Sequence, residues 1–244
     1  MVTSLGLHLH TAGVDLSPIQ PLWYDSALDL WIWRIPPNCR FEVDNYELSW
    51  PYNEPFDYIH GRELEGAIRD HKQLFRQAFD NLNPNGWFEM AAFEVNTMSD
   101  DNTHLKATCL LSSISNIHTS SKIFGKDMTS VSSWRRWMIK AGFVNVKEDD
   151  TSLIANKLPQ GPWSPDSNLQ ELGRYHQLNM LEGLSSYTYA LFTRVLGWQR
   201  IEIEALLAGA RRELKHHLIT CIHERILCTG KDRRIAQRNS IHAK

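Results

Sequence analysis

One stretch, residues 56–93, limits what this chain folds into. It begins with a short apolar run, Phe-Asp-Tyr-Ile-His-Gly-Arg at 56–62, and ends with a second apolar run entered through the turn sequence Asn-Pro-Asn-Gly at 83–86. Between the runs, apolar residues recur at the three- and four-residue spacing of an amphipathic helix: Leu64, Ile68, Leu74, Phe75, Ala78, Phe79 and Leu82. This order predicts one βαβ unit of a parallel sheet.

Chemically useful side chains come at the end of the first run. In open α/β sheets, ligands bind beyond the carboxyl ends of the strands. His60, Gly61 and Arg62 come just after the apolar part of the run, so we expect them at that edge of the sheet. This edge is the first place to expect a site.

Two acids end two further predicted strands upstream. Asp15 precedes Leu-Ser-Pro, and Asp44 with Asn45 follows the alternating residues 39–43. In nucleotide-binding folds, a carboxylate at the tip of the second strand accepts both ribose hydroxyls, because its two oxygens match a vicinal diol. Polar side chains at the next strand tip are suited to a purine edge. The alternatives are a turn residue for Asp15 and a solvated strand-to-loop transition for the other pair.

Composition excludes several classes of protein. The 244 residues carry a formal net charge of −2, which gives no electrostatic reason to expect nucleic acid. No apolar stretch approaches the roughly 18 to 20 residues of a transmembrane helix, and the N-terminus lacks the pattern of a signal peptide. The four Cys residues are scattered, which predicts reduced thiols in a cytoplasmic or nuclear protein, with neither a disulfide framework nor a metal site.

The rest of the chain is organised around a boundary rich in proline, residues 158–166, which predicts no regular element. Ser132 or Ser133 is placed to cap one helix and Gly142 to end it. Apolar spacing predicts helices at 105–117, 132–141, 169–184, 186–197 and 202–217, and strands at 143–147 and 219–227. We expect four segments: a core at 1–157, a helical insertion at 158–218, a last strand at 219–230 and a basic tail at 231–244.

A series of motifs runs through most of the chain. They are Gly-Val-Asp-Leu-Ser-Pro-Ile-Gln-Pro at 13–21, Pro-Pro-Asn-Cys-Arg-Phe-Glu-Val-Asp at 36–44, Phe-Asp-Tyr-Ile-His-Gly-Arg at 56–62, Gly-Trp-Phe-Glu-Met at 86–90, Ala-Gly-Phe-Val-Asn-Val at 141–146, Leu-Glu-Gly-Leu at 181–184 and Ala-Leu-Phe-Thr-Arg-Val-Leu-Gly-Trp at 190–198. In content and order they resemble the signatures of fungal LaeA-like S-adenosylmethionine-dependent methyltransferases.

The resemblance implies an α/β fold, the Rossmann-like sheet of class I methyltransferases, with a helical insertion before a final antiparallel strand. It implies S-adenosyl-L-methionine as the cofactor and a small molecule of fungal secondary metabolism as the methyl acceptor. Asp15 matches the acid that binds the cofactor ribose, and Asp44 with Asn45 matches the adenine side. His60 and Arg62 match the loop near the methionine end of the cofactor and the substrate.

The chemistry of methyl transfer gives His60 a conditional role. Transfer from a sulfonium is mainly a positioning task, so a general base is optional. If the acceptor is a hydroxyl or an acid, His60 would take its proton, because imidazole groups titrate near neutrality. The alternative is a turn in which His60 bonds its own backbone. Arg62 would orient an acidic group of the substrate, or pair with Glu63 or Glu65.

The chain also departs from the family's pattern. Relatives open with a strand ending in Gly-x-Gly-x-Gly, whose missing side chains let the backbone approach the methionine moiety; these residues contain no such motif. The aromatic-rich residues 23–35 also have no counterpart. We therefore expect an N-terminally truncated sheet and weak cofactor binding. The alternative function is a non-catalytic relative that binds a regulatory protein partner, and cofactor binding separates the two.

Overall fold

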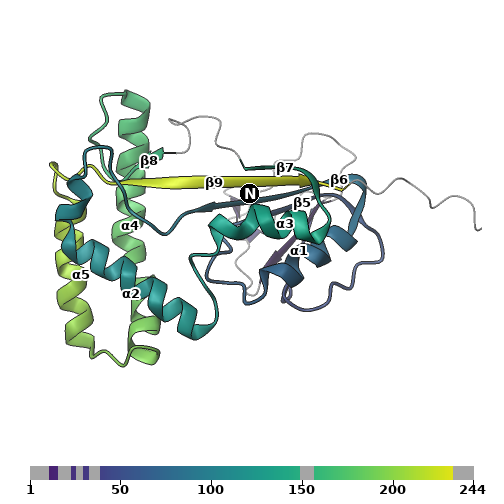
Figure 1. The fold of residues 1–244 in the computed structure, drawn as a ribbon, viewed down its shortest axis with the longest axis horizontal. Coiled ribbons are helices and arrows are strands. Elements are labelled where there is room, and N and C mark those ends of the chain that lie inside the picture. Colours follow the sequence, from purple (N-terminus) through teal and green to yellow (C-terminus); the bar gives the residue numbers. More distant parts are fainter. Residues whose placement is uncertain (1–10, 16–22, 26–29, 33–38, 149–156, 233–244) are drawn as a thin grey trace, which may run out of the picture. The chain divides into compact units, whose positions relative to one another are not determined.

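The computed structural model describes residues 11–15, 23–25, 30–32, 39–148 and 157–232. The chain forms two compact units, Met1–Tyr52 and Asn53–Lys244. Among the described residues, the first unit holds two two-stranded sheets and the second holds a five-stranded sheet (Figure 1).

The N-terminal unit contains a parallel strand pair. β1 (Thr11–Asp15) runs parallel to β4 (Cys39–Val43), and the register sets Asp15 beside Val43. Both strands were expected from the sequence, and both end at the same edge of the pair because they are parallel. Within the aromatic-rich segment, β2 (Trp23–Asp25) pairs antiparallel with β3 (Leu30–Ile32).

The sheet of the larger unit is mixed. Its strands are β5 (Phe56–Arg62), β6 (Leu82–Phe93), β7 (Val144–Glu148), β8 (Lys157–Pro159) and β9 (Ile222–Lys231). The order is β5-β6-β9-β7, with β8 pairing the first half of β9. β5 and β6 are parallel, whereas β9 is antiparallel to each of its neighbours. The predicted βαβ unit and the predicted antiparallel last strand are therefore confirmed.

The helices of the larger unit form two groups (Figure 1). α1 and α3 cover one face of the sheet, and α2, α4 and α5 gather beyond one end of it. The helices are α1 (His71–Asp80), η1 (Thr103–Lys106), α2 (Thr108–Phe124), η2 (Val131–Ser133), α3 (Trp134–Ala141), α4 (Ser167–Arg194) and α5 (Arg200–Leu214).

Aromatic rings fill the layer between the sheet and its two covering helices. Phe75 of α1 and Phe88 of β6 meet edge to face with ring centroids 5.4 Å apart, and Phe143 stacks on Phe88 at the same centroid distance. Trp134 and Met138 of α3 are fully buried. Such contacts bury large apolar areas, so this layer is the core that holds β5 and β6 in place.

The other helices share a second core. Its buried residues come from α2, α4 and α5 and the segments beside them: Ala107, Leu110, Ile114, Ile117, Met128, Leu184, Phe192, Ile203, Leu207, Ala210, Leu214 and Cys221. The expected insertion at 158–218 therefore packs against α2, which comes earlier in the chain. The expected segment boundaries stay a prediction.

The helix of the βαβ unit begins later than its apolar spacing indicates. The pattern starts at Leu64, but α1 starts at His71. Glu63 and Gly66 both have positive φ, 53° and 72°, and this interrupts any helix there. Asp70 then caps α1, its carboxylate accepting from the backbone N–H of Gln73 at 2.9 Å.

Two predictions in the second half were wrong in detail. The helices expected at 169–184 and 186–197 are one helix, α4, because Ser185 and Ser186 do not interrupt it. Residues 158–166 were expected to hold no regular element, yet Leu158 and Pro159 belong to β8. Pro159 is tolerated because, among the described strands, β8 pairs with β9 alone, as at a sheet edge. Gly142 does end α3 with φ 113°, as predicted.

A search of the described helices for one that is both long and apolar enough to cross a lipid bilayer finds none.

Candidate functional site

Three polar side chains lie close together on one face of the β5–β6 pair. Tyr58 and His60 are two residues apart on β5, so they point to the same face. Glu89 of β6 is the register partner of His60. The alternate residues Phe88 and Met90 are buried on the opposite face. The alternation of the two strands thus builds the cluster.

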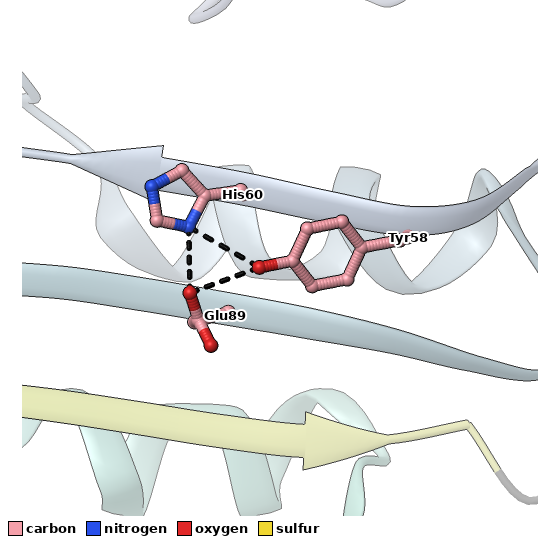
Figure 2. Close-up of polar contacts among 3 residues, drawn as sticks. All are labelled: Tyr58, His60 and Glu89. Atoms are coloured by element: carbon pink, nitrogen blue, oxygen red, sulfur yellow. Dashed lines mark hydrogen bonds and ion pairs between the residues drawn. The ribbon is translucent and has the colours of Figure 1, made fainter. Parts of the chain in front are cut away.

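The three side chains form a hydrogen-bonded triangle (Figure 2). His60 Nδ1 lies 2.8 Å from Glu89 Oε1, and the Tyr58 hydroxyl donates to the same oxygen at 2.9 Å. The Tyr58 hydroxyl and His60 Nδ1 are 3.4 Å apart. The His60 and Glu89 side chains keep 30% and 24% of their surface exposed, so the cluster is accessible from solvent.

The triangle determines which atoms carry protons. Burial, and then the hydrogen bond to Glu89, raises the pKa of Tyr58 well above its usual range, so its hydroxyl stays a donor. An ionised carboxylate only accepts hydrogen bonds, so the short contact requires a proton on His60 Nδ1. Neutral His60 therefore keeps its lone pair on Nε2, the atom farther from Glu89 (Figure 2).

The structure corrects the expected place of His60 and Arg62. Both were expected after the strand, but β5 continues through Arg62. The ladder extends one residue further, since the Glu63 N–H donates to Ala91 O at 2.9 Å. His60 is therefore a strand residue bonded to Glu89, and the alternative of a turn bonding its own backbone is wrong. Arg62 is exposed and makes no ion pair within residues 39–148 and 157–232.

The three residues expected on the cofactor side lie in the N-terminal unit. Asp15 is the last residue of β1, and its side chain lies outside what the structure describes. Asp44 follows β4, is exposed, and accepts the Asn45 N–H at 2.7 Å through Oδ1. Asn45 Oδ1 accepts the Glu47 N–H at 3.0 Å. Asp15 and Asp44 thus end neighbouring parallel strands, one residue out of register.

These residues fit the chemistry of an adenosine group. A purine edge offers donors and acceptors side by side. Asp44 has a second carboxylate oxygen that makes no hydrogen bond to the described residues, and the Asn45 amide nitrogen likewise has hydrogens to donate. An acid at the neighbouring strand end, Asp15, suits a vicinal diol.

Sequence reasoning missed Tyr58 and Glu89, although both lie in the motifs that it singled out. The spacing of Tyr58 and His60 gave the only available signal, a shared strand face. The partnership with Glu89 depends on the β5–β6 register, which the sequence does not state. Glu65, which the sequence suggested only as a partner for Arg62, lies in the turn after β5; its Oε2 is buried without a hydrogen-bond partner, and burial raises its pKa to about 8.

Comparison with known proteins places the chain among methyltransferases. Methyltransferase pytC of Aspergillus terreus is 34% identical over 220 residues, 90% of this chain and 63% of pytC. The probable methyltransferase tdiE of Emericella nidulans is 30% identical, over 68% of this chain and 50% of tdiE. The secondary metabolism regulator LAE1 of Cochliobolus heterostrophus is 28% identical, over 89% of this chain and 68% of LAE1.

The chain therefore spans less than two thirds of the length of pytC. A family described as methyltransferase domain matches residues 5–148. This match includes both strand pairs that carry the candidate residues, β1–β4 and β5–β6. Because the match covers more than half of its 244 residues, the chain belongs to the methyltransferase domain family.

Proposed function

We propose that this protein is an S-adenosyl-L-methionine-dependent methyltransferase that acts on a small molecule of fungal secondary metabolism. Membership of the methyltransferase domain family supports the reaction. The fungal relatives support the setting, since pytC is named a methyltransferase and LAE1 a regulator of secondary metabolism.

When bound, S-adenosyl-L-methionine supplies a methyl group on a positively charged sulfur. Asp15, at the end of β1, is assigned to the ribose hydroxyls of this cofactor. Asp44 and Asn45 are assigned to the adenine edge, through the carboxylate oxygen and the amide hydrogens that their own turn leaves open. Arg62, exposed at the end of β5, is assigned to an acidic group of the substrate.

His60 is assigned to the proton that the methyl acceptor loses. The observation that carries the assignment is the 2.8 Å hydrogen bond from His60 Nδ1 to Glu89 Oε1. It holds Nε2 as the basic atom and places a negative charge beside the imidazolium that forms after proton transfer. A positioned base of this kind contributes roughly 100-fold or more to a rate.

Two measurements on the 244-residue chain test the proposal. Calorimetry with S-adenosyl-L-methionine measures cofactor binding, and incubation with methyl-labelled cofactor and a fungal metabolite extract shows whether label enters small molecules. His60→Gln should lower the labelling rate about 100-fold and change cofactor affinity much less. His216→Gln, a change of an exposed histidine after α5, is the matched control and should leave the rate unchanged.

The other outcomes discriminate between the alternatives. Label found only on protein would contradict the small-molecule acceptor; one relative at 28% identity, laeA of Emericella nidulans, is named a protein-methionine methyltransferase. A chain that neither binds the cofactor nor transfers a methyl group would favour the non-catalytic alternative, a protein that binds a regulatory partner.

A further inference from the structure

Glu89 receives two hydrogen bonds on a single oxygen atom. Oε1 accepts from His60 Nδ1 and from the Tyr58 hydroxyl, whereas Oε2 makes no hydrogen bond to the described residues. A carboxylate held by one partner alone rotates about its last side-chain bond, because that torsion is broad. With two donors converging on Oε1, the carboxylate is fixed from two directions (Figure 2).

The Tyr58 side chain contributes little to the core, and its hydroxyl is used for the contact with Glu89. The residue is 54% exposed, and the described hydrogen bonds of its hydroxyl go to Glu89 and His60 alone. Its ring lies nearly parallel to the His60 ring, with an interplanar angle of 20° and centroids 6.2 Å apart. Removing the hydroxyl would leave no buried group unpaired, so the fold should tolerate it.

We propose that Tyr58 is a positioning residue: by holding Glu89 Oε1 against His60 Nδ1, it keeps neutral His60 in the tautomer whose Nε2 is basic. This inference rests on the proposed function for its role in methyl transfer, but the tautomer exists without cofactor or acceptor. Free imidazole side chains favour the opposite tautomer, with the proton on Nε2. The tautomer of His60 therefore reports directly on the triangle.

Long-range proton–nitrogen NMR correlation on the whole chain, with ¹⁵N-labelled histidine at pH 8.5, measures the tautomer. We expect the Nδ1–H form in the unaltered protein and a mixture in Tyr58→Phe. Glu89→Gln should shift His60 to the Nε2–H form. Adding Tyr58→Phe to Glu89→Gln should change nothing further, because Tyr58 acts through Glu89.

Tyr189→Phe is the matched control, because the Tyr189 hydroxyl also donates to a carboxylate, that of Glu204, with no histidine at the contact. It should leave the His60 spectrum unchanged. A Tyr58→Phe spectrum identical to that of the unaltered protein, or equal changes in both Tyr→Phe variants, would overturn the proposal.

A kinetic measurement separates this inference from the proposed function. If both hold, Tyr58→Phe should slow methyl transfer about tenfold, with the affinity for S-adenosyl-L-methionine unchanged. A tautomer change with no loss of rate would contradict the role of His60 as the base and, with it, any contribution of Tyr58 to methyl transfer. An unchanged tautomer with a tenfold loss of rate would overturn the positioning role and leave the methyltransferase proposal standing.

Discussion

Glu65 is a single side chain whose surroundings disfavour its charge. It lies in the turn after β5, between the positive-φ residues Glu63 and Gly66. Burial is the main cause that raises its pKa to about 8, and the neighbouring carboxylate of Glu63 adds to the effect. In the unfolded chain a glutamate is ionised above about pH 4.5. Folding at neutral pH must therefore bind a proton at Glu65.

The raised pKa of Glu65 makes the free energy of unfolding depend on pH. Because the folded-state pKa of Glu65 is raised, protonated Glu65 contributes fully to the free energy of unfolding below about pH 4.5. This contribution is lost as the pH rises through about 8. Glu65→Gln should raise the free energy of unfolding by about 2 kcal/mol at pH 9, after allowance for partial solvent exposure, and change it little at pH 5. Urea unfolding at the two pH values measures this. Glu63→Gln should show a smaller gain of the same sign, and equal stability of the Glu65→Gln variant and the unaltered protein at pH 9 would contradict the argument.

Asp15 is the residue on which cofactor binding is expected to depend. Asp15→Ala should weaken binding of S-adenosyl-L-methionine by roughly 1.5 to 3 kcal/mol, the usual loss when a charged hydrogen-bonding group is removed from a ligand. Calorimetry measures the change. Asp57→Ala is the control, because Asp57 Oδ1 accepts from Asn83 Nδ2 at 2.9 Å and so ties β5 to the first residues of β6. If Asp57→Ala abolishes binding in a folded protein while Asp15→Ala leaves it intact, the ribose assignment is wrong.

The sequence identified residues by type but not by partner. Asp15 and Asp44 were found because strand ends can be read from alternation and turn residues, whereas His60 was expected after a strand that continues through Arg62. The triangle needed the register of β5 against β6, which sets His60 opposite Glu89. That register is fixed by the whole sheet, so local sequence does not contain it.

Among the elements, α4 shows how a glycine inside a helix can mark a close contact. A Cβ added at Gly173 would lie 2.2 Å from the carbonyl oxygen of Gly161, a backbone atom of the segment after β8. At Gly183, in the same helix, the nearest atom would be an edge carbon of the Tyr187 ring at 3.3 Å. The first contact cannot relax without moving the backbone, whereas the second can relax by a small side-chain movement.

The two glycines therefore make a matched pair of substitutions. Gly173→Ala should lower the free energy of unfolding by about 2 to 3 kcal/mol, because overpacking against backbone outweighs the gain in helix propensity. Gly183→Ala should be neutral or stabilising by up to about 1 kcal/mol. Thermal unfolding of the two variants measures the difference, and equal melting temperatures would show that the Gly161 contact is easily relaxed.

Element boundaries were predicted less well than element types. The strands near β1, β4, β5, β6, β7 and β9 were all expected, because each is an apolar run with clear flanking residues. The start of α1 was missed because Ile68 is fully buried although it is not helical, so its apolar spacing belongs to a packed turn. Apolar spacing correctly predicted that Ile68 is buried, but it wrongly predicted that this residue is helical.

At the scale of the whole larger unit, a buried histidine pair joins the helical group to the sheet. His176 of α4 and His223 of β9 are 3.1 Å apart through Nε2 and Nδ1. Thr97, which follows β6, lies 3.5 Å from His223 Nε2 and accepts from the Gln160 amide at 3.1 Å. All four residues are buried, so segments from four parts of the chain meet in one hydrogen-bonded chain.

Burial makes this junction depend on neutral imidazoles. It lowers the pKa of His176 to about 4. Burial, followed by the charge of His176, lowers the pKa of His223 to about 3. The unfolded chain binds protons at histidine near pH 6.5, whereas the folded chain does not bind them until the pH is much lower. The two histidines should therefore contribute fully to the free energy of unfolding above about pH 6.5. This contribution should fall as the pH drops toward 4, because the unfolded state binds more protons in that window.

The loss attributable to His176 alone should be on the order of 3 kcal/mol at pH 4, since each unit of pKa difference corresponds to 1.36 kcal/mol. Carboxylates add their own acid dependence, so the test is a comparison between variants. His176→Gln should be less stable than the unaltered protein at pH 7.5, because the packing of the ring against Phe93 and His223 is lost, but its stability should fall less steeply between pH 6.5 and 4.5. His216→Gln changes an exposed histidine and should keep the original slope. Urea unfolding across this range measures both slopes; if the His176→Gln variant keeps the full slope, the junction does not control the acid response of the larger unit.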